Sequence, residues 1–87
     1  MDDLHLLLSC SNGESWEKRV CSVTLPAVNG SLGILRNHAP MLCALSDGTM
    51  SCRTEAGETT RIYISKGIAS VADNEVTLLL SYMRVLE

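Results

Sequence analysis

The hydrophobic and polar residues of this chain alternate with a period of two over several short stretches. Leu4, Leu6 and Leu8 share one face of an extended chain, although Leu7 makes the opposite face partly apolar as well. Successive side chains of a strand point to opposite faces, so the pattern predicts strands with one face in a core. The other predicted core faces comprise Cys21, Val23 and Leu25; Met50 and Cys52; Ile62 and Ile64; and Val76, Leu78 and Leu80.

Turn-forming residues separate these stretches at short, even intervals. Glycine and asparagine tolerate the positive φ that tight hairpins need. No long window keeps a helical period, and the stretch from Pro26 to Pro40 is predicted to be a short strand between two structured loops. Many short, evenly spaced strands predict an all-β sandwich or barrel. The turn signals are Ser11-Asn12-Gly13, Asn29-Gly30, Asp47-Gly48, Ala56-Gly57, Lys66-Gly67 and Asp73-Asn74.

Length and charge exclude several classes of function. The chain has 87 residues, which suits one domain covering residues 1–87. Its net charge is −3 and its seven basic residues are scattered, so nucleic-acid binding is not expected. The longest nearly apolar runs, Leu4–Leu8 and Val76–Leu80, are too short for a membrane helix. Any contact with a membrane is therefore expected to run through a partner.

The spacing of the four cysteines suits neither a zinc site nor a disulfide framework. No pair has CxxC spacing, and neither His5 nor His38 falls in a ligand-like cluster with a cysteine. We therefore expect reduced, mostly buried thiols in a cytosolic protein, with a metal site or structural disulfides as the alternatives. These residues are Cys10, Cys21, Cys43 and Cys52.

No catalytic site is predicted. His38 is the best candidate for a general base, but no acidic residue follows it before Asp47, so it would need a distant carboxylate brought near by the fold. His38 is expected instead to order its own loop through hydrogen bonds from its ring nitrogens. The stretch Gly30–Gly33 lacks the frame of a phosphate-binding loop, and no cofactor is expected. Trp16 is interpreted as a packing residue, with a binding hot spot as the alternative.

The stretch from Gly30 to Leu45, GSLGILRNHAPMLCAL, resembles the epsilon subunit of F-type ATP synthases. The HAP segment, His38 to Pro40, is its most specific part. Arg36 stands where that family usually has proline, and Cys43 where it usually has threonine. Weaker matches occur in the right order at Val20–Leu25, Asp47-Gly48, Tyr63–Ala69 and Asn74–Leu79. The resemblance covers essentially the whole chain and implies a two-sheet β-sandwich of about ten short strands.

The resemblance also implies a function. Members of that family are non-catalytic rotor subunits of the central stalk, which bind the gamma subunit and the proteolipid ring and couple ion flow to ATP synthesis. It therefore implies these two partners and a peripheral position on the cytoplasmic side of a bacterial membrane. Family members usually continue into a C-terminal helical hairpin that inhibits ATP hydrolysis and in some bacteria binds ATP. This chain ends at Glu87, so neither activity is expected, whether the form is naturally short or an excised domain.

The partner-binding residues are predicted from the same resemblance. An acidic residue that often contacts the ring in this family aligns with Ser31, so hydrogen bonds from Asn29, Ser31 and His38 are expected in its place. An apolar patch for a permanent partner is expected at Leu7 and in the region Leu32–Met41, with packing inside the sandwich as the alternative. The predicted partner-binding residues are Asn29, Ser31, Leu32, His38 and Met41.

Two other classes of function compete with the rotor subunit. One is a free-standing β-sandwich module that binds a different protein. The other is a small hydrolase that uses His38, whose turnover would disappear in His38→Ala. Binding to a gamma subunit separates the first from the rotor subunit.

Overall fold

The computed structural model describes residues 1–86, and within that range every regular element is a β-strand. The all-β class is therefore confirmed. No helix in this range has the length and hydrophobicity needed to cross a membrane. The ten strands are β1 (Leu4–Cys10), β2 (Ser15–Val20), β3 (Ser22–Ala27), β4 (Gly30–Leu35), β5 (Met41–Leu45), β6 (Gly48–Arg53), β7 (Thr59–Ile64), β8 (Gly67–Ala72), β9 (Glu75–Leu80) and β10 (Met83–Leu86).

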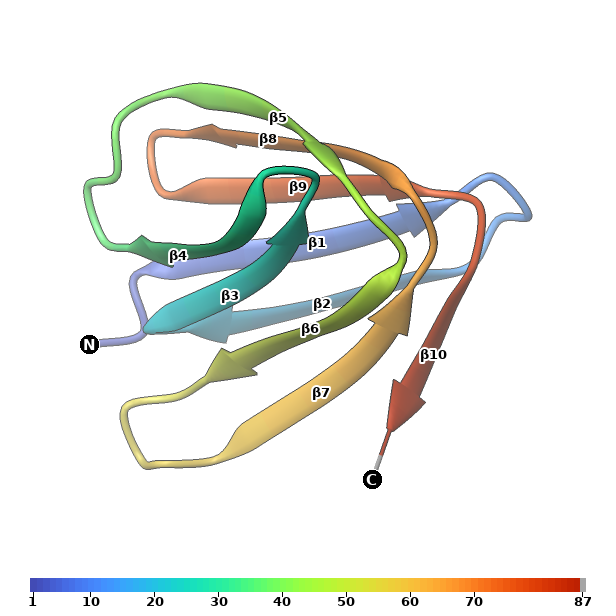
Figure 1. The fold of residues 1–87 in the computed structure, drawn as a ribbon. Coiled ribbons are helices and arrows are strands. Elements are labelled where there is room, and N and C mark those ends of the chain that lie inside the picture. Colours follow the sequence, from blue (N-terminus) through green and yellow to red (C-terminus); the bar gives the residue numbers. More distant parts are fainter. Residues whose placement is uncertain (87) are drawn as a thin grey trace.

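The strands form one strongly curled sheet. Their order is β10-β7-β6-β3-β5-β8-β9-β1-β2, and β4 pairs only with β3. The pair β1–β9 is parallel and the others are antiparallel. The curl folds the sheet into two layers, with β3, β6 and β7 facing β1, β2 and β9 across the core (Figure 1). Strands β2, β4 and β10 are left with one unpaired edge each.

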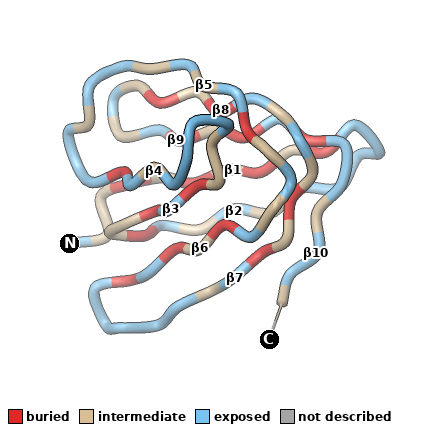
Figure 2. The backbone as a smooth tube through the Cα atoms, viewed as in Figure 1, coloured by how far each residue is buried: buried red, intermediate tan, exposed pale blue. Residues whose placement is uncertain are grey.

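A single apolar cluster fills the space between the layers. More buried and less buried residues alternate along most strands, as the red, tan and pale blue segments of Figure 2 show. The predicted core faces of β1, β6, β7 and β9 are confirmed, and Trp16 packs against the cluster as predicted. The cluster comprises Leu4, Leu6, Leu8, Cys10, Val20, Val23, Leu25, Ile34, Leu45, Met50, Cys52, Ile62, Ile64, Ala69, Val71, Val76, Leu78 and Leu80.

Two predictions for the region around β3 are wrong: that Cys21 belongs to the core face with Val23 and Leu25, and that a loop begins at Pro26. Val20–Leu25 is not one strand, because Val20 ends β2 and a bend at Cys21 precedes β3. The bend shifts the phase of the alternation, so Val20 and Val23 are both buried while Cys21 is only half-buried. Pro26 lies inside β3, where its carbonyl accepts a hydrogen bond from the Ser46 amide at 2.8 Å. The expected short strand is present, as β4.

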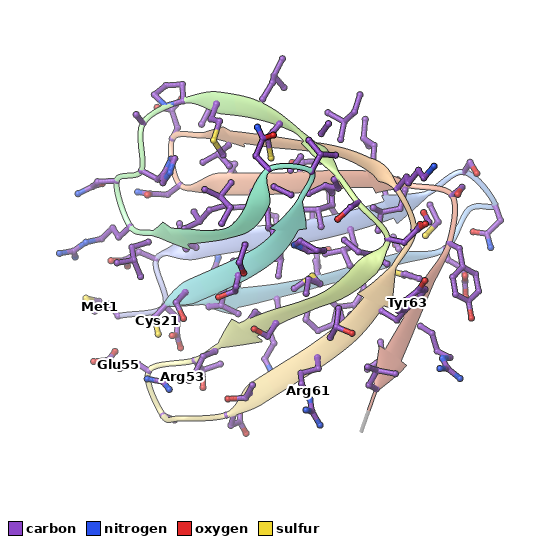
Figure 3. All side chains as sticks on the ribbon, viewed as in Figure 1. Met1, Cys21, Arg53, Glu55, Arg61 and Tyr63 are labelled. Atoms are coloured by element: carbon purple, nitrogen blue, oxygen red, sulfur yellow. The ribbon has the colours of Figure 1, made fainter. Side chains whose placement is uncertain are left out.

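Polar contacts join the start of the chain to the other layer. The ammonium group of Met1 lies 2.9 Å from Glu55 Oε1, and the Glu55 amide donates to Asp2 Oδ1 at 2.8 Å. The Cys21 amide donates to the carbonyl of Arg53 at 2.8 Å. Met1, Cys21, Arg53 and Glu55 lie at the same end of the sandwich in Figure 3. These contacts link the β6–β7 turn to β1 and to the β2–β3 bend.

Candidate functional site

The structure divides the predicted partner-binding residues between the two ends of β4. Asn29 lies in the turn before β4, and Ser31 is the second residue of this strand. His38 lies in the loop that follows the strand. A strand of six residues spans about 17 Å, so His38 and Asn29 belong to opposite ends of the hairpin layer. Asn29 and Ser31 are exposed at the tip of the β3–β4 hairpin, next to the exposed side chain of Val28, while His38 belongs to a separate loop.

Leu32 and Met41 contribute mainly to the interior of the sandwich. Both are half-buried and pack against the core cluster. Leu32 lies opposite Leu25 in the β3–β4 pair, and Met41 lies opposite Val71 in the β5–β8 pair. This favours the packing interpretation that the sequence left open for these two side chains.

A hydrogen bond joins the loop that contains His38 to the β8–β9 turn. The Asn37 amide donates to Asn74 Oδ1 at 2.7 Å, and the carbonyl of Asn74 accepts a hydrogen bond from the His5 amide at 2.9 Å. His38 Nδ1 lies 2.7 Å from the carbonyl oxygen of Ala39, a contact that requires a proton on Nδ1. The ring thus bonds within its own loop, as the sequence predicted.

Asn74 is expected to contribute measurably to stability through this contact. Its φ is +62°, a conformation that asparagine tolerates better than alanine. Asn74→Ala therefore loses the bond to Asn37 and adds backbone strain, and should lower the free energy of unfolding by about 1–2 kcal/mol in urea titrations. Asn74→Gly removes the side chain without the strain and should lose less. Equal losses in the two variants would contradict a contribution from backbone strain.

A surface that was not predicted lies on the outside of β9, β8 and β5. Leu42, Ile68 and Leu79 have 76%, 52% and 56% of their surface exposed. Ile68 lies opposite both Ala44 and Leu79 in the strand register, and Leu42 lies opposite Ser70. We call Leu42, Ala44, Ile68 and Leu79 the outer apolar face. Leu7, predicted to be part of an apolar patch, is half-buried and lies opposite Thr77 beside this face.

Charged residues are nearly absent from the two rows that cross this face. One row runs Ser15, Ser9, Leu79, Ile68, Ala44; the other runs Glu17, Leu7, Thr77, Ser70, Leu42. Their only charged member is Glu17, on the far strand β2. A shallow hollow borders Ile68 and Leu79 and is also lined by Lys66, Gly67 and Ser81. The signal in the sequence was a set of leucines and isoleucines at solvent-facing positions of alternating strands.

The cysteines are free and fall into two pairs by burial. Cys10 and Cys52 are buried, whereas Cys21 and Cys43 are half-buried, so the expectation of mostly buried thiols holds for two of the four. Burial raises the pKa of the Cys10 and Cys52 thiols, which keeps both sulfurs protonated and unreactive. Among residues 1–86, no three His, Cys, Asp or Glu side chains gather in a way that would hold a metal ion.

Comparison with known proteins places this fold in a defined group. Residues 3–83 match the family model described as ATP synthase, Delta/Epsilon chain, beta-sandwich domain. The chain is 46% identical over 66 residues to the ATP synthase epsilon chain of Synechococcus sp. (strain PCC 6716), and 38% identical over 76 residues to that of Gloeobacter violaceus. These matches cover 76% and 87% of this chain, and 47% and 57% of the relatives. The chain thus spans about half the length of these curated relatives.

Solved structures agree with the sequence comparison. A chain in the cryo-EM structure of Euglena gracilis mitochondrial ATP synthase, OSCP/F1/c-ring in rotational state 1, superposes with a TM-score of 0.86 at 25% identity. That match covers 94% of this chain and 52% of the other. A chain in the central stalk/c-ring structure of Tetrahymena thermophila mitochondrial ATP synthase gives 0.76 at 14% identity, covering 94% and 66%, and so supports the fold alone.

Proposed function

This chain belongs to the family of ATP synthase delta/epsilon chains, through their β-sandwich domain, and on that premise we propose that it is a non-catalytic rotor subunit of an F-type ATP synthase. In this role it binds the gamma subunit and the proteolipid ring of the central stalk, and helps to couple ion translocation to ATP synthesis. The membrane is reached through the complex, on the cytoplasmic side of a bacterial membrane.

The observation that carries the proposal is the outer apolar face. Exposed large apolar side chains are ordinary when scattered, but a contiguous group of them marks a protein interface. Leu42, Ile68 and Leu79 come from three adjacent strands and have no charged residue between them. A rigid sheet holds them in place, so binding a permanent partner there costs little ordering of the backbone. We assign this face to the gamma subunit.

The tip of the β3–β4 hairpin is assigned to the ring. Asn29 and Ser31 are exposed and supply hydrogen-bonding groups but no charge, which suits contact with polar loops. His38 lies beyond the opposite end of β4. We propose that it contributes indirectly, by ordering the loop that leads into β5, a strand of the outer apolar face. Leu32 and Met41 then support the two surfaces from within. This division gives each of the predicted partner-binding residues a place in the proposed rotor.

Titration calorimetry with the gamma subunit of the same organism tests the assignment. Wild-type protein is expected to bind one to one, and Ile68→Glu should weaken binding about 30-fold or more, because a carboxylate would be buried among apolar groups. The matched control is Val85→Glu, which places the same charge at an exposed apolar position on β10, outside this face. Circular dichroism confirms that each variant is folded.

The outcomes distinguish a wrong binding surface from a wrong function. If Ile68→Glu and Val85→Glu bind like the wild type, gamma uses another surface. If folded wild-type protein does not bind gamma at all, the rotor assignment is wrong and the free-standing interaction module takes its place.

A further inference from the structure

One titratable side chain bridges three strands on the same side of the sheet as the outer apolar face. His5 Nδ1 lies 2.8 Å from Glu75 Oε1, on β9, and His5 Nε2 lies 2.5 Å from Glu17 Oε2, on β2. Strand β1 carries His5 and pairs with both of these strands, antiparallel to β2 and parallel to β9. The imidazole therefore has a carboxylate at each of its two nitrogens. We call His5, Glu17 and Glu75 the histidine clasp.

The chemistry of imidazole makes this arrangement dependent on protonation. A charged ring donates a hydrogen bond from both nitrogens, whereas a neutral ring donates from one and presents a lone pair at the other. In the neutral state one carboxylate would face that lone pair and lose its bond. Both carboxylates favour the charged form, and hydrogen bonds to Glu17 and then Glu75 raise the pKa of His5 above its ordinary value of 6.5.

The other charged groups around the clasp leave it close to electrical balance. Arg19, on β2, lies directly opposite His5 in the register. Asp73 lies in the turn before β9, and Asp3, next to the start of β1, pairs with Arg36 at 3.1 Å. When His5 is charged, it and Arg19 offset the two glutamates, so the named groups together carry one net negative charge, that of Asp73. Loss of the proton leaves an excess negative charge between β2 and β9.

Strand β2 is the element that this change affects most. It is the last strand of the sheet and is paired along its length only with β1. Val20 and Trp16 hold its inner face against the core, and the other ion pair of this strand, between Lys18 and Glu58 at 3.7 Å, is exposed and contributes little. We propose that His5 is a pH-responsive clasp: the charged ring bridges the edge strand β2 to β9 through both carboxylates, and the neutral ring, which donates from one nitrogen only, breaks this bridge and loosens β2.

The direction of the effect follows from linkage. Because the pKa of His5 is higher in the folded protein than in the unfolded chain, the clasp contributes its full stabilisation below about pH 6.5. That contribution is lost as the pH rises through the folded-state pKa. Within the pH range in which Glu17 and Glu75 stay ionised, loosening is therefore expected on the alkaline side.

Amide hydrogen exchange of β2, read by NMR across about pH 6–9, tests this proposal. After correction for intrinsic exchange, local opening of β2 in the wild type should increase about two- to fivefold from the acidic to the alkaline end. His5→Gln should abolish this dependence. Glu58→Gln, which removes the other ion pair of β2 but leaves the clasp intact, should retain it.

The proton titration of the His5 ring gives a second readout that needs no change to His5 itself. The midpoint of this titration should lie at lower pH in Glu17→Gln and in Glu75→Gln than in the wild type, because each variant removes the carboxylate at one ring nitrogen. An unchanged midpoint in both variants overturns the clasp. A corrected opening of β2 that is the same at all pH values, or the same in wild type and His5→Gln, overturns its role in fastening the strand.

Discussion

Leu78→Ala is expected to lower the free energy of unfolding by about 2–5 kcal/mol. Leu78 is fully buried in β9, opposite Leu8 of β1 and Ala69 of β8. Removing its branched end loses apolar burial and leaves a cavity that strands held on both sides cannot close. A chain of this length is stable by roughly 4–13 kcal/mol, so the loss is a large part of the total. Urea titration followed by circular dichroism measures it.

The neighbouring leucine is the matched control for this prediction. Leu79 has the same side chain on the same strand but points outward, with 56% of its surface exposed. Leu79→Ala should change stability by no more than about 0.5 kcal/mol. Similar losses in the two variants would mean that β9 does not present Leu78 to the core, and would contradict the register described above.

Gly67→Ala is expected to lower the free energy of unfolding by about 3 kcal/mol, at the upper end of the range for overpacking. A Cβ at this position would stand 2.2 Å from the carbonyl oxygen of Leu79 and 2.9 Å from Cδ2 of Leu80. Gly67 pairs with Leu80 at the start of β8, so the nearest obstacle is backbone that belongs to the ladder. This clash can be relieved only if strands β8 and β9 move apart. Chemical denaturation measures the loss.

Gly33→Ala provides the comparison for Gly67→Ala. Gly33 is also in a strand, and a Cβ added there would meet nothing within 4 Å. This variant should retain the stability of the wild type or gain slightly, because alanine reduces the freedom of the unfolded chain. Loss of stability at Gly33 but not at Gly67 would contradict the steric explanation.

In the folded fraction, Gly67→Ala should also displace Leu79 and so weaken binding at the outer apolar face.

The sequence by itself determined the all-β class and most of the core. Period-two alternation places Leu4, Leu6 and Leu8 inside, and the same holds for Val76, Leu78 and Leu80, because a strand has only two faces and one of them must be buried. The turn signals fall at strand junctions, as at Asp73-Asn74, since both residues adopt the positive φ that their side chains tolerate. Local chemistry is sufficient for these features.

Only the tertiary structure decided which strands become neighbours. Pairing of β1 with β9 brings His5 beside Glu75, and pairing of β5 with β8 brings Ala44 beside Ile68. Alternation reports the face of a residue but not the partner of its strand, so neither the histidine clasp nor the outer apolar face was predicted as a unit. The bend at Cys21 and the close contact at Gly67 were not predicted, for the same reason. Each depends on backbone from a distant part of the chain, which no local pattern encodes.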